Sequence, residues 1–277
     1  MPLADLPGST TGPDAAVVRV LSYNIRSMRD DREALARVIR ACAPDVVCVQ
    51  EAPRFFRWRK AAAWLARETG LVYTTGGATA AGPMILTSLR AHVERAEDTL
   101  LPRVPGLHRR GFATAVLRFG GGHRDTGLRD TGRPANGRPE GGDGSGVRLG
   151  VVSCHLSLAE AERYEQAGML LDHVTALDVP YAIAAGDIND RPDGRAFRRI
   201  AGKLRDGWAT EPWGSEATFS PKDPRRRIDG VFASEGIEII GCGVPAGLPG
   251  VTDADLRAAT DHLPVLAALR LPRVSPA

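Results

Sequence analysis

The residues best suited to chemistry in this chain centre on one short stretch, Gly186-Asp187-Ile188-Asn189. It follows the apolar run at residues 179–183, which has the length and composition of a buried strand. Asp187 and Asn189 stand two residues apart, so on an extended backbone their side chains point to the same side. A carboxylate beside an amide at a strand end can orient a water molecule or hold a metal-bound phosphate. Turn formation alone is the alternative, because Asp and Asn side chains readily hydrogen-bond their own backbone.

Several other predicted strands also begin or end beside polar residues. These residues are Asn24, Glu51, His155, Asp229, Asp261 and His262. Each has an ordinary structural explanation: Asn24 suits a turn, and Asp229 follows three arginines that could pair with it. Gathered at one edge of a sandwich, however, the set would form a single pocket in which four carboxylates repel each other. A divalent cation would relieve that repulsion, and oxygen ligands without clustered Cys or His favour Mg²⁺ or Mn²⁺.

The other members of the set suit a phosphate. Two histidines and two amides can donate hydrogen bonds to an anion. A metal ion together with such donors would stabilise a phosphoryl centre that gains charge during attack. The combination predicts phosphoester chemistry.

The elements that must position these residues can be read from the hydrophobic pattern. A strand at 17–23, a helix capped by Asp30-Asp31 and a strand at 45–50 come first. A helix from about 54 to 68 would then bury Phe55 and Leu65. Strands at 84–89, 92–100 and 112–119 follow one another without helices, which predicts antiparallel neighbours.

The second half repeats the mixture of strands and helices. Strands are predicted at 147–154, 227–232, 237–242 and 263–269. A short helix near 195–200 is predicted to follow the turn at Asp187. Ser157-Leu158-Ala159-Glu160 fits a capping box that opens a further helix. Residues 1–15 are predicted to be a flexible lead-in. The Gly-rich segment at about 120–146 is interpreted as a flexible loop between flanking strands, with a domain boundary as the alternative.

Composition excludes some classes of protein. The chain has 277 residues, 43% hydrophobic residues and a net charge of +3, as in an ordinary globular protein. It contains no apolar run long enough to cross a membrane, so we expect no integral membrane association. The start of the chain lacks the features of a signal peptide, which predicts a cytoplasmic location. The four cysteines form no Cys-x-x-Cys pair and are predicted to be buried thiols.

The ordered motifs resemble the endonuclease/exonuclease/phosphatase superfamily of metal-dependent phosphoesterases, to which deoxyribonuclease I belongs. They are Ser22-Tyr23-Asn24, Val49-Gln50-Glu51, Ser153-Cys154-His155-Leu156, Gly186-Asp187-Ile188-Asn189, Arg227-Ile228-Asp229-Gly230-Val231 and Thr260-Asp261-His262-Leu263-Pro264-Val265. The resemblance implies a single domain over 16–272 with an α/β fold, a four-layer α/β/β/α sandwich of two mostly antiparallel sheets flanked by helices.

The resemblance also implies a role for each residue. Glu51 would be the principal Mg²⁺ ligand, with Asn24 and Asp261 beside it. Asp187 would orient or deprotonate the attacking water, and Asn189 would position that water and contact the phosphate.

The two histidines would act on the substrate. His262 would contact the scissile phosphate, held in its tautomer by Asp229. His155 would touch a phosphate oxygen or help the leaving group. Arg110, in Arg109-Arg110-Gly111, resembles an arginine placed near the substrate, with a solvated turn as the alternative.

The expected activity is Mg²⁺-dependent phosphoester hydrolysis, with phosphodiesters preferred, nucleic acid among them, and the chain a monomer. A phosphomonoesterase or a phospholipase C-type hydrolase of inositol phosphate, sphingomyelin or another headgroup is the alternative within this class. A non-catalytic binding protein on the same scaffold is the alternative of another class. The arginines of 54–60 interleave with aromatic residues and could bind phosphate, although their spacing favours a helix with one core face and one charged face.

Overall fold

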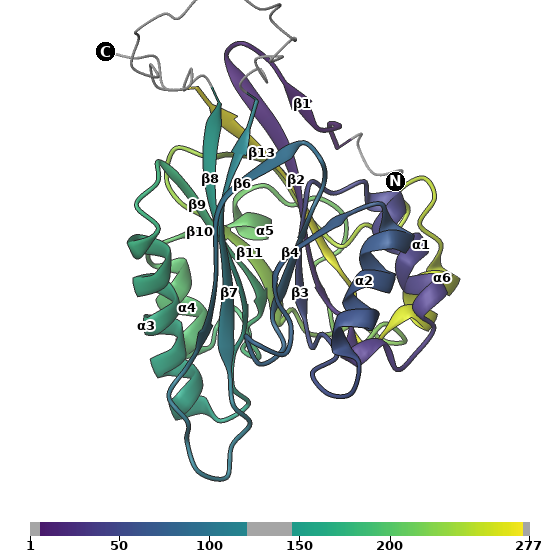
Figure 1. Cartoon of the computed structure of the whole chain (residues 1–277), viewed down its shortest axis with the longest axis vertical. Coiled ribbons are helices and arrows are strands. Elements are labelled where there is room, and N and C mark those ends of the chain that lie inside the picture. The colour runs from purple at the N-terminus through teal and green to yellow at the C-terminus, as the bar shows by residue number, and fades with distance from the viewer. Residues whose placement is uncertain (1–5, 121–145, 274–277) are drawn as a thin grey trace, which may run out of the picture.

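Two β-sheets pack face to face in a computed structural model that describes residues 6–120 and 146–273 (Figure 1). The first sheet contains, in spatial order, β12 (Glu238–Gly243), β13 (Val265–Pro272), β2 (Ala15–Asn24), β3 (Val46–Gln50), β5 (Met84–Thr87) and β4 (Val72–Gly76), with β1 (Thr10–Thr11) paired to β2. Of these pairs only β2 with β3 is parallel.

The second sheet is built in the same manner. Its spatial order is β10 (Arg205–Asp206), β11 (Asp229–Ala233), β9 (Tyr181–Asp187), β8 (Val147–His155), β7 (Gly111–Phe119) and β6 (Ala91–Leu100). Only β8 with β9 is parallel. Both sheets are therefore mostly antiparallel, as predicted.

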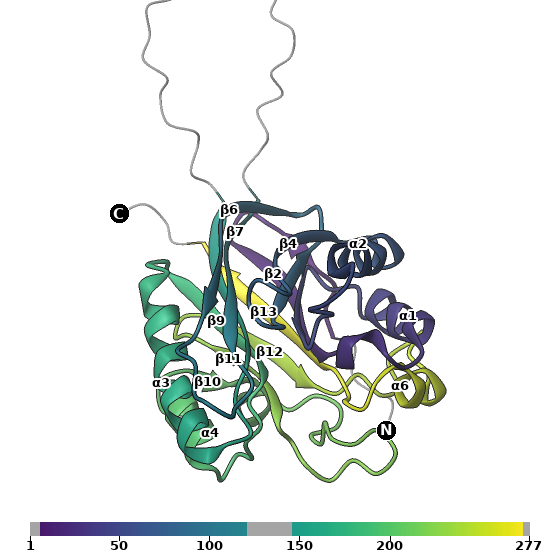
Figure 2. The same cartoon turned by 60° about the horizontal axis from the view of Figure 1, so that its bottom comes forward.

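Helices cover the outer face of each sheet (Figures 1 and 2). The first sheet carries α1 (Arg32–Cys42), α2 (Trp58–Thr69) and α6 (Asp253–Ala259), and the second carries α3 (Glu160–Ala176) and α4 (Arg195–Ala201). The short α5 (Gly207–Thr210) and the 3₁₀ turn η1 (Arg26–Met28) lie in connections. The predicted α/β/β/α sandwich is confirmed.

The alternation of side chains along β2 explains this layering. Val18 and Val20 face the interior between the sheets, whereas Leu21 and Tyr23 face the helices. The strand is thus buried on both faces, and for this reason it is a nearly continuous apolar run in the sequence.

The topology brings the ends of strands from both sheets to the same end of the molecule. β2 and β3 finish there, and β13 starts there, because Val265 pairs with Ser22 near the end of β2. In the second sheet β8 and β9 finish together, and antiparallel β11 starts beside them with Asp229 opposite Asp187. Polar residues that are distant in sequence are thereby placed side by side.

Two local predictions were wrong. The helix expected from residue 54 begins at Trp58, and Phe55 is 80% exposed rather than buried. Arg57 adopts a left-handed backbone conformation with φ of 58°, which interrupts any helix before it. The capping box is also absent, because Ala159 is the N-cap of α3 and the Ser157 hydroxyl accepts from the Ala159 amide at 3.1 Å instead.

The segment predicted as a flexible lead-in contacts the domain from residue 6 onward. Leu6 is buried, its carbonyl accepts from the Arg19 guanidinium, and β1 pairs with β2. The predicted loop at 120–146 lies, apart from its two end residues, outside the described part of the chain. All four cysteines are buried free thiols, as expected. No helix among the described residues is long and apolar enough to cross a membrane.

Candidate active site

Asp187 lies at the centre of the polar cluster formed by the strand ends. It is the last residue of β9 and is 1% exposed. One carboxylate oxygen accepts from the Asn189 backbone amide at 2.9 Å. The other accepts from the Asn24 side chain at 3.1 Å and lies 3.4 Å from Nε2 of His155. Asp187 is therefore held by residues from both sheets.

Asn24 joins Asp187 to Glu51. Its side-chain nitrogen also donates to Glu51 Oε1 at 3.4 Å, and its oxygen accepts from the Arg26 backbone amide at 3.1 Å. Glu51 follows β3 directly and adopts a left-handed conformation with φ of 53°. That conformation is unusual for a residue with a side chain, and it ends the strand where the carboxylate meets the pocket.

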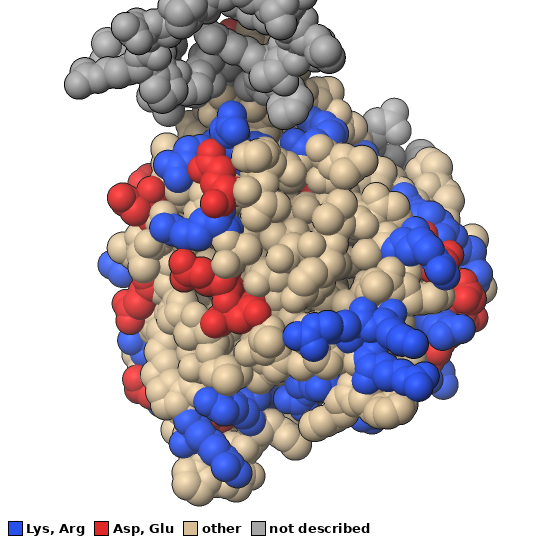
Figure 3. Space-filling view, in the orientation of Figure 1, with Lys and Arg blue, Asp and Glu red and all other residues tan. Residues whose placement is uncertain are grey.

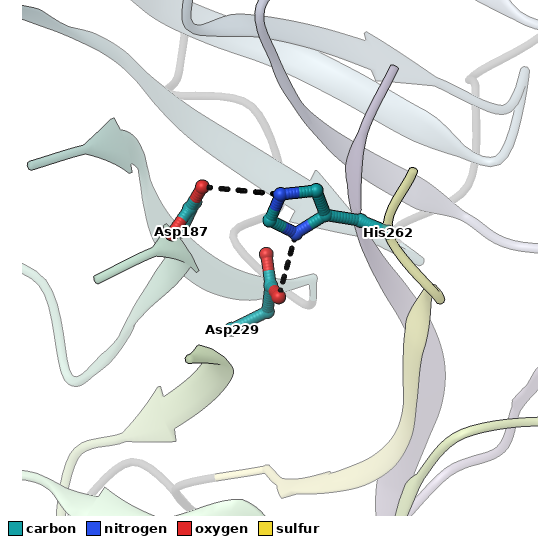
Figure 4. Close-up of side chains that lie close together, drawn as sticks. All are labelled: Asp187, Asp229 and His262. Carbon is teal, nitrogen blue, oxygen red and sulfur yellow. Dashed lines mark hydrogen bonds and ion pairs between the residues drawn. The ribbon is translucent and has the colours of Figure 1, made fainter. Parts of the chain in front are cut away.

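His262 lies between two carboxylates (Figure 4). Its Nδ1 is 3.0 Å from Asp229 Oδ2, and its Nε2 is 3.8 Å from Asp187 Oδ2. All three residues are buried. Burial is the largest single effect on the His262 pKa and lowers it, but the attraction of Asp229, Asp187 and Asp261 outweighs burial and raises the pKa to about 10. The imidazole is thus held as a cation.

Two neighbouring groups, Asp187 and His155, have pKa values shifted toward their neutral forms. Burial, with a contribution from the Asp229 charge, raises the pKa of Asp187 to about 7. Burial also holds the His155 pKa well below its ordinary value, and the nearby Arg110 and His262 charges lower it further. The site therefore combines a carboxylate that titrates near neutrality, a neutral imidazole and a cationic imidazole.

These residues line a pocket of about 400 Å³. Six of the predicted residues are on its wall: Glu51, Arg110, His155, Asp187, Asn189 and His262. Asn24 and Asp229 lie behind them, joined by the hydrogen bonds given above. Asp261 is placed differently, since its side chain is 38% exposed and pairs with the Arg26 guanidinium at 3.3 Å.

Arg110 is a buried cation on the pocket wall. It is 8% exposed, and its Nε has no hydrogen-bond partner among the described residues. Burial lowers its pKa, while the Asp187 and Glu51 charges raise it. A buried guanidinium on a pocket wall is suited to binding an anion.

The site includes residues that the motifs did not reveal. Arg29, His108 and Arg226 also line the pocket, although they come from loops whose sequence gives no positional signal. Thr218 is fully buried, and its hydroxyl accepts from the backbone amides of Ile228 and Asp229 at 3.2 and 3.3 Å. It fixes the point at which β11 presents Asp229.

The donor set suits a hard divalent cation. The Glu51 carboxylate faces the pocket and has no ion-pair partner in the described chain. The Glu51 and Asp187 carboxylates supply oxygen ligands of the kind that Mg²⁺ and Mn²⁺ prefer. The Asn24 amide, whose nitrogen faces both carboxylates here, would have to turn its oxygen toward the ion to join them. Asp187, Asp229 and His262 also offer ligand atoms within 4.8 Å of one another, but the contact between His262 and Asp229 already occupies one atom of each.

The sequence model of the Endonuclease/Exonuclease/phosphatase family matches residues 21–262, a span that contains all of these site residues. The chain belongs to this family. The family assignment agrees with the ordered motifs, which lie at the strand ends described above. A comparison with curated proteins found no match.

Solved structures share the family fold over nearly the whole chain. An endonuclease/exonuclease/phosphatase from Bacteroides vulgatus is 18% identical with a TM-score of 0.65, covering 92% of this chain and 99% of that one. A mannosyl-6-phosphatase from Bacteroides thetaiotaomicron is 17% identical with a TM-score of 0.66, covering 91% and 99%. D. rerio TDP2 humanized by 14 mutations is 16% identical with a TM-score of 0.62, covering 91% and 98%. At these identities the similarity establishes the fold alone.

Proposed function

We propose that this protein is a divalent-metal-dependent phosphoester hydrolase that acts on phosphodiesters, nucleic acid among them, as a monomer. The observation that carries the proposal is the buried row of Asp229, His262 and Asp187, of which His262 and Asp187 line one pocket with Glu51. It combines a general base, a cationic donor and a metal-binding carboxylate within reach of one phosphoryl group.

Each residue has a role that its surroundings support. Asp187 takes a proton from the attacking water, and its pKa of about 7 suits a base that works near neutral pH. Asn189, whose backbone amide donates to Asp187, lies on the same wall and positions that water. Cationic His262 donates to a phosphate oxygen as negative charge develops, while Asp229 fixes its ring. Neutral His155 contacts a second oxygen on the leaving-group side.

The remaining charges bind substrate and metal. Arg110, on the pocket wall, binds a phosphate oxygen through its guanidinium group. Glu51 would hold Mg²⁺ or Mn²⁺ with Asn24, and Asp261 would join them by leaving Arg26. When bound, the ion would neutralise charge on the phosphate and lower the pKa of a coordinated water.

A second candidate substrate class is favoured by the shape of the site. A pocket of about 400 Å³ suits one headgroup or a small phosphate ester better than a long polymer. The mannosyl-6-phosphatase with the same fold acts, by its name, on such a monoester. Phosphomonoester hydrolysis and phospholipase C-type headgroup hydrolysis are therefore the second candidates.

The test is hydrolysis of bis-p-nitrophenyl phosphate and p-nitrophenyl phosphate by the wild type and by Asp187→Asn, with Mg²⁺ or with EDTA. We expect wild-type turnover that needs the metal and falls by about a thousandfold in Asp187→Asn. The preferred ester separates diesterase from monoesterase. Absence of turnover on these esters and on a panel of DNA, inositol phosphates and sphingomyelin would support a binding protein instead.

A further inference from the structure

The mouth of the pocket is bordered by exposed apolar side chains on two sides. On the loop between β3 and α2, Phe55 is 80% exposed and Phe56 is 87% exposed. Across the mouth, Leu158 is 72% exposed between β8 and α3. Arg54 and Leu158 both line the pocket, so each border adjoins the site directly. Three of the four most exposed large apolar side chains in the described chain are therefore pocket-lining residues or lie within two residues of one.

The Leu158 side is extended by the loop between β6 and β7. Val104 and Leu107 on this loop are more than a third exposed. Together with Leu101 and Met169 they line a groove of about 470 Å³ that begins one residue beyond Leu158, at Ala159. The groove is almost entirely apolar and opens beside the pocket, although Glu162 and Glu165 border it on the α3 side. We call the Phe55–Phe56 loop, Leu158 and the 101–110 loop the rim.

Positive charge accompanies both parts of the rim. Arg54, Arg57, Arg59 and Lys60 surround the two phenylalanines, and Arg103 and Arg109 lie on the opposite loop. The Arg57 guanidinium lies 5.0 Å from the centre of the Phe56 ring. Figure 3 shows Lys and Arg side chains gathered over the start of α2 and on the loop at the bottom of the view.

We propose that the rim is a docking surface for an anionic lipid bilayer, with the pocket facing the headgroups. Exposed phenylalanine and leucine side chains enter the boundary between headgroups and acyl chains, and neighbouring arginines bind anionic headgroups. Single-stranded nucleic acid is less suitable, because Leu158, Val104 and Leu107 have no ring on which a base could stack. The apolar groove beside the pocket has the lining needed by a lipid tail.

Docking itself does not require catalysis, but the idea that it delivers a lipid phosphoester to the pocket rests on the proposed function. The first experiment therefore measures binding alone. The full chain in EDTA is sedimented with vesicles of phosphatidylcholine or of phosphatidylcholine mixed with phosphatidylglycerol. The variants are Phe55→Ser with Phe56→Ser, and Leu158→Ser.

Leu89→Ser is the matched control. Leu89 is 87% exposed, but it lies between β5 and β6 at the end of the sheet away from the site, since Thr87 pairs with Val46 at the start of β3. We expect the wild type and Leu89→Ser to bind the phosphatidylglycerol vesicles equally, and the rim variants to bind about tenfold or more weakly. All of these side chains are exposed, so unchanged melting temperatures will show that the variants fold.

Two results would overturn the proposal: no binding of the wild type to anionic vesicles, or equal binding by the rim variants. A single-stranded oligonucleotide is tested in parallel as the rival partner. If the wild type binds the oligonucleotide but not the vesicles, and the Phe55/Phe56 variant loses oligonucleotide binding, the rim would be assigned to nucleic acid. Hydrolysis of soluble bis-p-nitrophenyl phosphate separates the two proposals. The Phe55→Ser/Phe56→Ser variant, whose two side chains do not line the pocket, should keep it, and vesicle binding without any turnover would contradict only the proposed function.

Discussion

Asp187 is fully buried, yet it must ionise to act as a base. Burial and the neighbouring Asp229 charge favour the protonated form, whereas His262 and hydrogen bonds from Asn24 and Asn189 favour the ion. The opposing effects leave its pKa at about 7. A residue in this situation serves catalysis at some cost in stability, because the folded state at alkaline pH contains a buried carboxylate.

This cost predicts the pH dependence of an Asp187→Asn variant. The pKa of Asp187 is raised from 3.8, its ordinary value, to about 7 in the folded protein. Protonation of Asp187 therefore stabilises the folded state, fully below pH 3.8, and this stabilisation is lost as the pH rises through 7. The neutral amide has no such loss. We expect Asp187→Asn in EDTA to melt above the wild type at about pH 8, by about 2–4 °C for each kcal/mol gained.

The gain should shrink at about pH 4.5, where folded wild type holds a neutral carboxyl group and the two proteins are more alike. Thermal melts at the two pH values test this prediction. The same difference in melting temperature at both would show that burial of charge is not the cause.

The residue types of the site could be predicted from the sequence, but their partners could not. Positions at the ends of strands identified Glu51, Asp187 and His262, because a buried strand bordered by a polar residue is visible as a pattern. The ion pair of Asp261 with Arg26 depends on a left-handed turn that no local signal predicts. The roles assigned to these residues remain predictions until variants are assayed.

At the scale of elements, the start of β11 is fixed by a side chain from another segment. The Thr218 hydroxyl accepts from the backbone amides of Ile228 and Asp229, immediately before the carboxylate that contacts His262. Since this part of the chain is buried, no water replaces the hydroxyl readily. Thr218 is therefore a positioning residue for the Asp229–His262 contact.

We expect Thr218→Val, which keeps the shape and removes the acceptor, to lower the free energy of unfolding by about 1–3 kcal/mol. The turnover number should fall while KM changes little, because the substrate does not contact Thr218. A weaker Asp229 contact also reduces the attraction that raises the His262 pKa, so the alkaline limb of the pH–rate profile should move to lower pH. Thr218→Ser should restore both properties. A stability loss without movement of the alkaline limb would leave Thr218 a purely structural residue.

The buried strands were predictable from their apolar runs, whereas some of the short elements were not. β2 and β8 are nearly continuous apolar runs, interrupted by Arg19 and Arg148, so their patterns stood out. β4 has two exposed residues among five and was not predicted. Phe55 and Phe56, which precede α2, were assigned to the helix, because hydrophobic spacing cannot show that Arg57 adopts a left-handed backbone conformation.

At the scale of the whole molecule, the site lies at one end of the second sheet, and residues 120 and 146, which flank the 121–145 segment, lie at the other. Phe119 at the end of β7 pairs with Val147 at the start of β8, and β8 runs from there to His155 in the site. Nine residues of strand span roughly 25–30 Å. No candidate site residue comes from the segment between.

We expect replacement of residues 121–145 by a short Asn-Gly turn to leave hydrolysis of bis-p-nitrophenyl phosphate unchanged, because the paired ends of β7 and β8 are close enough for a tight hairpin. The assay is kcat/KM for the replaced and natural chains at equal fraction folded. A large fall in kcat/KM with an unchanged melting temperature would assign the segment a part in the reaction.

The interleaving of strands has one more consequence. β12 and β13 come from the second half of the chain and complete the first sheet, while β6 and β7 come from the first half and complete the second. A backbone cut between residues 120 and 146 would therefore give two pieces that each contribute strands to both sheets and catalytic groups to one pocket. The two pieces would remain associated after the cut. If they were expressed separately, hydrolysis would report whether they had associated.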